Sequence, residues 1–149
     1  MNQANADLLW EKIRDPNARD LVKHLGIEIT YLGPDAIRGS MPVDERTHQP
    51  YGLLHGGASV VLAETLASFG SFLHLDAATE MGVGLEINAN HLKSVRTGRV
   101  LGEAKPVHVG RKTQVWAIEI KSEDGKLVCV SRCTIAVVAR EPKSEAKPR

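Results

Sequence analysis

The sequence predicts an α+β fold in which a curved antiparallel sheet wraps around one long central helix. Residues 55–76 are apolar on nearly every side, which is typical of a buried helix. The segments that flank this helix alternate between apolar and polar residues, which is typical of strands. Short turns join the later strands, and such turns imply antiparallel neighbours. A sheet that curves around the helix explains why the helix lacks a polar face.

The length and charge of the chain restrict its class. With 149 residues, the chain can form one domain with a sizeable core. We expect this domain, with its N-terminal helical segment, to span 1–140, and the charged 141–149 to be a disordered tail. A net charge of +1 argues against a nucleic-acid partner, and no apolar run approaches the ~20 residues of a membrane span. The N-terminus shows no secretory leader, so we expect a cytoplasmic protein.

Two cysteines lie four residues apart in a segment that we expect to be a strand. Cys129 and Cys133 would then be about 13 Å apart at ~3.3 Å per residue, too far for a disulfide. The chain has no Cys-x-x-Cys and no His or Cys cluster with zinc spacing. We therefore expect both cysteines to be core residues, and we expect neither a metal nor a cofactor.

The N-terminal part is predicted to be helical. Residues 6–14 have helical spacing that ends before Pro16. Asn17 can cap a second short helix through Leu25, and Gly26 follows as a stop signal. We expect these helices to lie over one end of the sheet and to carry no chemistry.

Six strands are predicted around the central helix. Two precede it, at 27–31 and 36–43, with a turn at 33–35 between them. A polar loop at 44–52 leads into the helix. The strands after the helix are expected at 81–92, 99–109, 113–121 and 127–139, joined by turns at 97–98, 110–112 and 123–125.

The start and the middle of the central helix carry candidate catalytic groups. Gly56 and Gly57 leave bare N–H groups at the positive end of the helix dipole, which suits a carbonyl oxygen that becomes an anion. Alternatively, the two glycines only allow close backbone packing. Glu64 is a carboxylate within the apolar run, about 12 Å further along the axis at ~1.5 Å per residue. If both groups are catalytic, the site must lie between two subunits that are related by a two-fold axis.

Polar residues near these groups are further candidates. Ser68 and Phe72 follow Glu64 at helical spacing and share its face. The Ser68 hydroxyl can bind water, the glutamate or a substrate, or it can simply bond back to its own helix. Gln49 and His55 flank the helix entry and can donate to a substrate carbonyl, although a loop glutamine is often only solvated.

Two stretches resemble a known family. MPVDERTHQPYGLLHGGASVVLAETLASFGS and VGLEINANHLKSVRTGRV are similar to the hotdog-fold acyl-CoA thioesterases. The resemblance is strongest to the branch of 1,4-dihydroxy-2-naphthoyl-CoA hydrolase and the enterobactin-proofreading thioesterases, which is related to a 4-hydroxybenzoyl-CoA thioesterase. It extends over about 27–138.

The resemblance implies an activity and a site. It implies a homodimer, usually paired into a homotetramer, that hydrolyses thioesters of coenzyme A or acyl-carrier protein, here of aromatic acids. Glu64 would be nucleophile or general base, and the Gly56 N–H, Gln49 and His55 would polarise the carbonyl. Ser68 would place the acyl group or water. The residues implied to bind substrate or CoA are His91, Leu92, Lys93, Ser94, Gly110, Arg111, Lys112, Phe69 and Phe72.

Basic residues near the same turns and strand ends suit a polyanion such as CoA, or they form an ordinary solvated face. They are Lys93, Arg96, Arg99, Arg111, Lys112 and Arg132.

Two alternative functions stay open at this point. One is a hotdog dehydratase or hydratase that uses His48 and Glu64, which would retain the thioester instead of releasing a thiol. The other is a non-catalytic acyl-CoA-binding module, which would bind its ligand without turnover.

Overall fold

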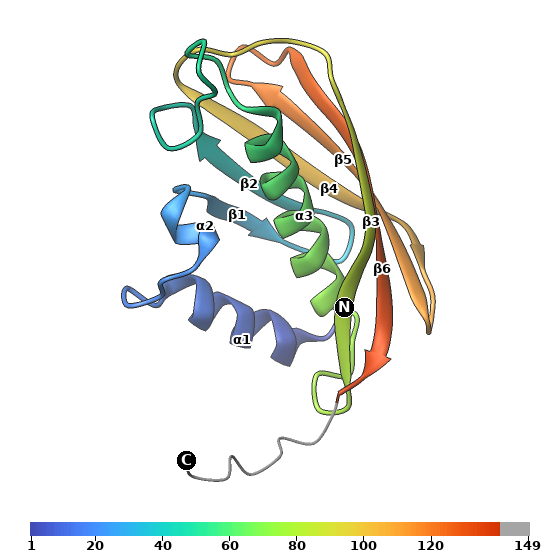
Figure 1. Cartoon of the computed structure of the whole chain (residues 1–149). Coiled ribbons are helices and arrows are strands. Elements are labelled where there is room, and N and C mark those ends of the chain that lie inside the picture. The colour runs from blue at the N-terminus through green and yellow to red at the C-terminus, as the bar shows by residue number, and fades with distance from the viewer. Residues whose placement is uncertain (141–149) are drawn as a thin grey trace, which may run out of the picture.

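The structure is a computed structural model that describes residues 1–140 (Figure 1). The tail predicted at 141–149 lies outside the described residues. The elements in chain order are α1 (Gln3–Arg14), α2 (Leu21–His24), β1 (Glu28–Leu32), β2 (Ile37–Pro42), α3 (Gly56–Phe72), β3 (Glu80–His91), β4 (Arg99–Val109), β5 (Thr113–Ser122) and β6 (Leu127–Ala139).

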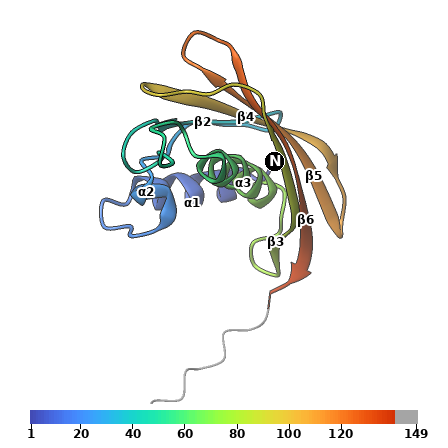
Figure 2. The same ribbon diagram turned by 45° about the horizontal axis from the view of Figure 1, so that its top comes forward.

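The six strands form one antiparallel sheet in the order β1-β2-β4-β5-β6-β3. The sheet curves around α3, which Figure 2 shows nearly end-on inside the curve. The predicted α+β architecture is therefore confirmed. The core lies between α3 and the sheet, and Leu62, Leu66, Trp116 and Ile118 are among its fully buried side chains.

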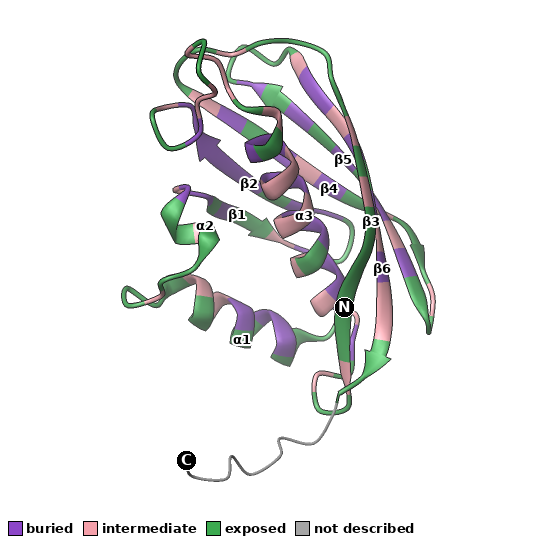
Figure 3. Ribbon diagram, viewed as in Figure 1, coloured by how far each residue is buried: buried purple, intermediate pink, exposed green. Residues whose placement is uncertain are grey.

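α3 carries the chain from β2 to the far edge of the sheet, so that β3 pairs only with β6. Nine of the twelve residues of β3 are exposed, and Figure 3 shows this strand mostly green. The exposed residues include Met81, Val83 and Leu85. A long strand with exposed apolar residues and one unpaired edge is prone to pair with another chain.

The burial of α3 differs from the prediction in one respect. The side that faces the sheet is buried, including Ala63 and Ala67, but Glu64 is only half-buried and Ser68 is exposed. The prediction that every side of this helix contacts core is wrong for a single chain. The reason is that β3 is the last strand of the sheet, and nothing in residues 1–140 covers the helix beyond it.

The N-terminal helices also differ from the prediction. α1 begins at Gln3, because the side chain of Asn2 accepts hydrogen bonds from Ala4 and Asn5 and caps the helix. α2 begins at Leu21 with Asp20, rather than Asn17, as its cap.

α1 packs against the C-terminal end of α3. The Asn5 side-chain amide donates to the carbonyl oxygens of Phe72 and Leu75 at 2.8 and 2.9 Å, while Ala6 and Leu9 are buried beside it. The amide thereby adds donors to carbonyl oxygens at the end of α3 and in the turn that follows it.

Two further predictions are tested by the described residues. Cys129 and Cys133 are free and buried on β6, as expected. None of the described helices is both long enough and apolar enough to cross a membrane.

Candidate active site

The first turn of α3 presents one unpaired backbone donor. His55 caps the helix, and its Nδ1 accepts the Gly57 N–H at 2.8 Å. The Ala58 and Ser59 N–H groups both donate to the His55 carbonyl oxygen. The Gly56 N–H has no hydrogen-bond partner within residues 1–140, so it is free to bind an oxygen atom at the positive end of the helix dipole.

A hollow of about 350 Å³ lies beside this donor and brings together six of the predicted site residues. Its lining comes from the entry loop, the start of α3, the end of β3 and β6, and consists of Gln49, Leu53, Leu54, Gly56, Ser59, His91, Leu92, Lys93, Ser94 and Val128. The His91 ring lies so close to Gly56 that a Cβ built there would be 2.7 Å from Nε2. Glycine at this position therefore allows the His91 ring to lie against the helix start.

The hydrogen bonds of Gln49 and His55 leave donors available. The Gln49 Oε1 accepts the backbone N–H of Tyr51, so its amide NH₂ is the group left for a ligand. The His55 Nδ1 accepts the Gly57 N–H, which fixes the neutral tautomer with the proton on Nε2. Both side chains therefore keep a donor available for a carbonyl oxygen, although only Gln49 lines the hollow.

His48, the histidine of the dehydratase alternative, has a different position. One of its ring nitrogens lies 2.8 Å from the Arg96 carbonyl oxygen, and the ring does not line the hollow. Leu54 donates to Val95 in the same region, so His48 helps to hold the entry loop against the segment after β3. This contact gives His48 a structural role in the entry loop.

Glu64 lies at mid-helix and faces β3. A Cβ built on Gly84 would be 2.6 Å from Glu64 Oε1, so the bare backbone of Gly84 makes room for the carboxylate. Glu64 does not line the hollow around Gly56. The structure thus keeps these two groups about 12 Å apart along one helix, at ~1.5 Å per residue, as the sequence predicts.

A second hollow, of about 300 Å³, begins one helical turn beyond Glu64. It contains the predicted residues Ser68, Phe69 and Phe72, and its full lining is Leu9, Lys12, Ser68, Phe69, Ser71, Phe72, Leu75, Met81, Gly82 and Ile135. Nine of the predicted site residues therefore divide between two hollows, with Glu64 between them, and His55 and the 110–112 bend line neither.

The bend at 110–112 lies far from His91. In the register of the sheet, His91 pairs with Cys129 while Thr113 pairs with Ala136. Seven residues of β6 separate these positions, about 23 Å at ~3.3 Å per residue. A single chain therefore does not bring Gly110, Arg111 and Lys112 to the hollow that His91 lines, and their binding of CoA stays a prediction.

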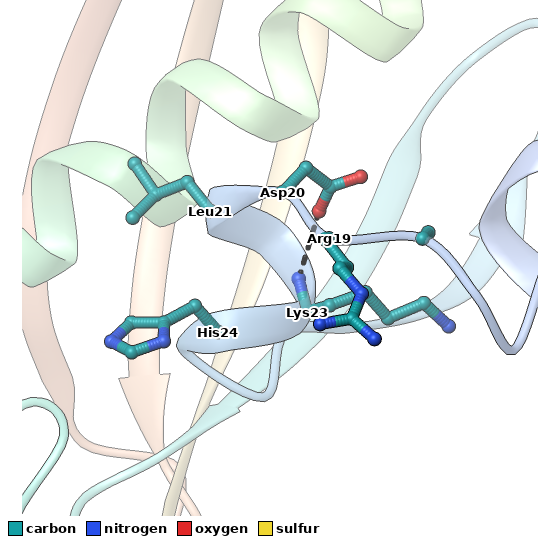
Figure 4. Close-up of a pocket in the computed structure, with 6 residues that line it drawn as sticks. Arg19, Asp20, Leu21, Lys23 and His24 are labelled. Carbon is teal, nitrogen blue, oxygen red and sulfur yellow. Dashed lines mark hydrogen bonds between the residues drawn. The ribbon is translucent and has the colours of Figure 1, made fainter.

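A third hollow, at α2, holds none of the predicted site residues. It measures about 600 Å³ and is lined by Ala18, Arg19, Asp20, Leu21, Lys23 and His24 (Figure 4). All six residues belong to one short continuous segment, so no other element contributes a group to it. Within residues 1–140, no three His, Cys, Asp or Glu side chains lie close enough together to hold a metal ion.

Comparison with known proteins identifies the family. Residues 51–129 match the sequence model of the Thioesterase superfamily. The chain belongs to this superfamily. It is 51% identical over 119 residues to 1,4-dihydroxy-2-naphthoyl-CoA hydrolase of Escherichia coli, a match that covers 80% of this chain and 87% of the relative.

Further relatives agree with this assignment. The chain is 48% identical over 131 residues to a proofreading thioesterase of Cronobacter turicensis, covering 86% of this chain and 93% of the relative. A crystal structure of a mutant thioesterase from Pseudomonas aeruginosa superposes with a TM-score of 0.84 at 47% identity, over 87% of this chain and 94% of that one. The protein is therefore a hotdog-fold thioester hydrolase.

The predicted cations of this thioesterase have unequal surroundings. Arg99 donates to Ser40 and pairs with Glu28 at 3.3 Å, so it stabilises the β1-β2-β4 side of the sheet. Lys93 lines the hollow beside Gly56. Partial desolvation and the neighbouring Lys126 ammonium lower the pKa of Lys93. Lys126 is itself paired with Asp124 at 2.6 Å, as Arg99 is with Glu28, so Lys93 is the cation that this rim leaves for an anionic group.

Sequence reasoning missed several residues of this thioesterase that shape the site. Gly82 and Gly84 face α3 from β3, and glycines two apart in a strand are a recognisable signal for close approach. Lys126 and Ser59 gave no such signal, because their positions depend on how distant elements pack.

Proposed function

We propose that this thioesterase hydrolyses CoA thioesters of aromatic acids at sites shared between the two subunits of a homodimer. The observation that carries the proposal is the position of two groups on α3. The unpaired Gly56 N–H and the Glu64 carboxylate lie about 12 Å apart at ~1.5 Å per residue, so one thioester cannot contact both in a single chain. Two antiparallel copies of α3 would bring the Gly56 of one subunit to the partner's Glu64.

The free edge of β3 supports this arrangement. Antiparallel pairing of β3 with a second copy would cover its exposed apolar residues and continue the sheet. The same two-fold axis would bring the 110–112 bend of one subunit to the end of the sheet where the partner's His91 lies. One two-fold rotation would thus bring Gly56 to the partner's Glu64 and the 110–112 bend to the partner's His91. We further propose that two such dimers form the homotetramer implied by the family resemblance.

The chemistry follows from the available donors. In the proposed site, the thioester carbonyl oxygen accepts the Gly56 N–H and the Gln49 amide, with the His55 Nε2–H as a further donor, and these stabilise the developing negative charge. Glu64 of the other subunit removes a proton from water as the water attacks the carbonyl carbon. The C–S bond then breaks, and CoA leaves as a thiol after taking up that proton. In the covalent variant, Glu64 itself attacks and water hydrolyses the resulting anhydride.

The substrate class rests on similarity and on charge. The Escherichia coli relative is named for a naphthoyl-CoA substrate, and that name supports an aromatic acyl group here. Lys93 in the lining of the first hollow suits a phosphate of CoA.

Release of free thiol from a panel of CoA thioesters tests the proposal. The panel contains benzoyl, hydroxybenzoyl, hydroxynaphthoyl, phenylacetyl and straight-chain acyl groups. We expect fast aryl turnover that falls by at least about 100-fold in Glu64→Gln, since a catalytic base contributes that much, while the variant keeps its fold. Near-normal turnover in Glu64→Gln would overturn the mechanism, and faster turnover of straight chains would overturn the substrate class. Rapid-quench mass spectrometry then separates an acylated Glu64 from direct attack by water.

A further inference from the structure

The second hollow joins the central helix to a part of the chain outside the family match. Leu9 and Lys12 come from α1, and the family model begins only at residue 51. α1 is held in place by Asn5, which donates to Phe72 and Leu75 at the end of α3. α1 therefore forms one wall of this hollow, and its hydrogen bonds to the end of α3 hold that wall in place.

Ser71 provides an unpartnered polar group at this hollow. Its residue is 1% exposed, and its Oγ has no hydrogen-bond partner within residues 1–140. The hydroxyl lies against β3, where a Cβ built on Gly82 would be 3.0 Å from Oγ, and both residues line the hollow. A buried hydroxyl without a partner destabilises a fold, so its presence in the wall indicates a ligand that supplies the missing bond.

The position of Ser71 defines the length of that ligand. Ser71 lies seven residues beyond Glu64 on α3, roughly 10 Å along the axis at ~1.5 Å per residue. An acyl group whose carbonyl lies at Glu64 must be longer than a single benzoyl ring to reach it. Lys12, on the neighbouring helix, adds an exposed ammonium to the same lining.

We infer that Ser71 and Lys12 select acyl groups that carry a hydrogen-bond-accepting oxygen at the end remote from the thioester. The Ser71 hydroxyl donates to this oxygen, and the Lys12 ammonium adds a further preference when the oxygen belongs to a carboxylate. This inference rests on the proposed function, because it takes the acyl group to extend from Glu64 along α3.

Three thioesters that differ only at the remote end test the inference. They are octanoyl-CoA, its analogue with a terminal hydroxyl, and the mono-CoA thioester of octanedioic acid. We expect the wild type to prefer the two oxygenated acyl groups in kcat/KM. Ser71→Ala should reduce kcat/KM for both by roughly 5- to 10-fold, the effect of one hydrogen bond, and leave octanoyl-CoA unchanged. Lys12→Met should lower kcat/KM only for the thioester that ends in a carboxylate, and Lys12→Arg should keep kcat/KM for this substrate near the wild-type value. Lys23→Met on α2 serves as the matched control.

Two further readouts separate this inference from the proposed function. Calorimetric titration with the corresponding CoA thioethers measures the same selectivity without turnover, so a failure of hydrolysis leaves the inference testable. Ser71→Ala should also raise the Tm of the free protein, because it removes an unpaired buried hydroxyl, whereas a structural serine would lower it. Equal kcat/KM or Kd values for all three acyl groups in the wild type, or an equal loss for all three in Ser71→Ala, would overturn the inference.

Discussion

The Glu64 carboxylate lies directly against the backbone of Gly84 on β3, where a Cβ would be 2.6 Å from Oε1. A β-bulge between Gly84 and Glu86 shifts the register immediately after this contact. Because of this shift, Gly82 and Gly84 face α3 before the bulge and Ile87, Ala89 and His91 face it afterwards. One strand thus leaves room for the carboxylate and also places His91 at the helix start.

Gly84→Ala should lower turnover without unfolding the protein. The new methyl group would displace the end of a flexible side chain, so the free energy of unfolding should change by no more than about 1 kcal/mol. A carboxylate displaced by ~1 Å can nevertheless cost on the order of 100-fold in kcat. Thiol-release kinetics and thermal melts measure the two effects. In the double variant Gly84→Ala/Glu64→Gln, the glycine substitution should add no further loss, and an additive loss would show that it acts elsewhere.

Asn5→Ala should destabilise the protein through the contact between α1 and α3. The substitution leaves the carbonyls of Phe72 and Leu75 without their side-chain donor, at a cost of about 1–3 kcal/mol. Chemical denaturation measures this loss. Gln3→Ala is the matched control, because Gln3 is an exposed amide on the same helix that bonds only to Asp7, and it should change stability by less than about 0.5 kcal/mol. Equal effects of the two substitutions would contradict the anchoring role of Asn5.

The two cysteines should resist alkylation in the folded protein. Burial raises the pKa of Cys129, and it raises that of Cys133 to about 11, with a smaller contribution from the Glu64 and Glu86 carboxylates. Since the thiolate is the reactive form, both thiols stay protonated and unreactive at pH 8, and Cys133 becomes reactive only as the pH approaches about 11. Iodoacetamide labelling followed by mass spectrometry tests this, with guanidinium-unfolded protein as the positive control. Rapid labelling of either cysteine at pH 8 in the folded protein would refute it.

The sequence predicts the strands better than the ends of the N-terminal helices. The expected bounds of β4 and β6 agree with the structure, because glycine-containing turns lie on both sides of β4, and β6 follows such a turn and is rich in Val, Ile and Thr. The start of α1 was missed, because Asn2 is followed by polar residues rather than an apolar run. The packing of α1 on α3 could not be predicted, since it depends on hydrogen bonds from Asn5 to Phe72 and Leu75, which lie 67 and 70 positions further along the chain.

Part of the candidate site could also be predicted. Gln49, Gly56 and His91 share a hollow because an entry loop and a strand end both meet the start of α3. The placement of Gly110 at the other end of the sheet could have been inferred, since the eleven residues of β4 separate the turns at its two ends. Ser71 gave no signal in the sequence, because the absence of a partner for its hydroxyl is a property of the packed structure.

Mixed dimers provide a direct test of the shared site. Gly56→Pro removes the proposed N–H donor at the first residue of α3, where the backbone suits proline because His55 has φ −69 and ψ 131. The new Cβ would also displace the His91 ring, so Gly56→Ala, which adds a Cβ but keeps the N–H, is the control. Loss of this donor should lower kcat by about 100- to 1,000-fold, and Glu64→Gln by a similar factor.

Each variant alone should therefore be nearly inactive. A dimer that combines one Gly56→Pro subunit with one Glu64→Gln subunit should regain one intact site. This site would take the unmodified Gly56 of the Glu64→Gln subunit and the unmodified Glu64 of the Gly56→Pro subunit. Co-expression with two affinity tags isolates this mixed dimer, and its thiol release should be roughly half that of the wild type by the symmetry of the dimer. If each subunit carried its own complete site, the mixed dimer would stay as inactive as its parents, and the shared site would be refuted.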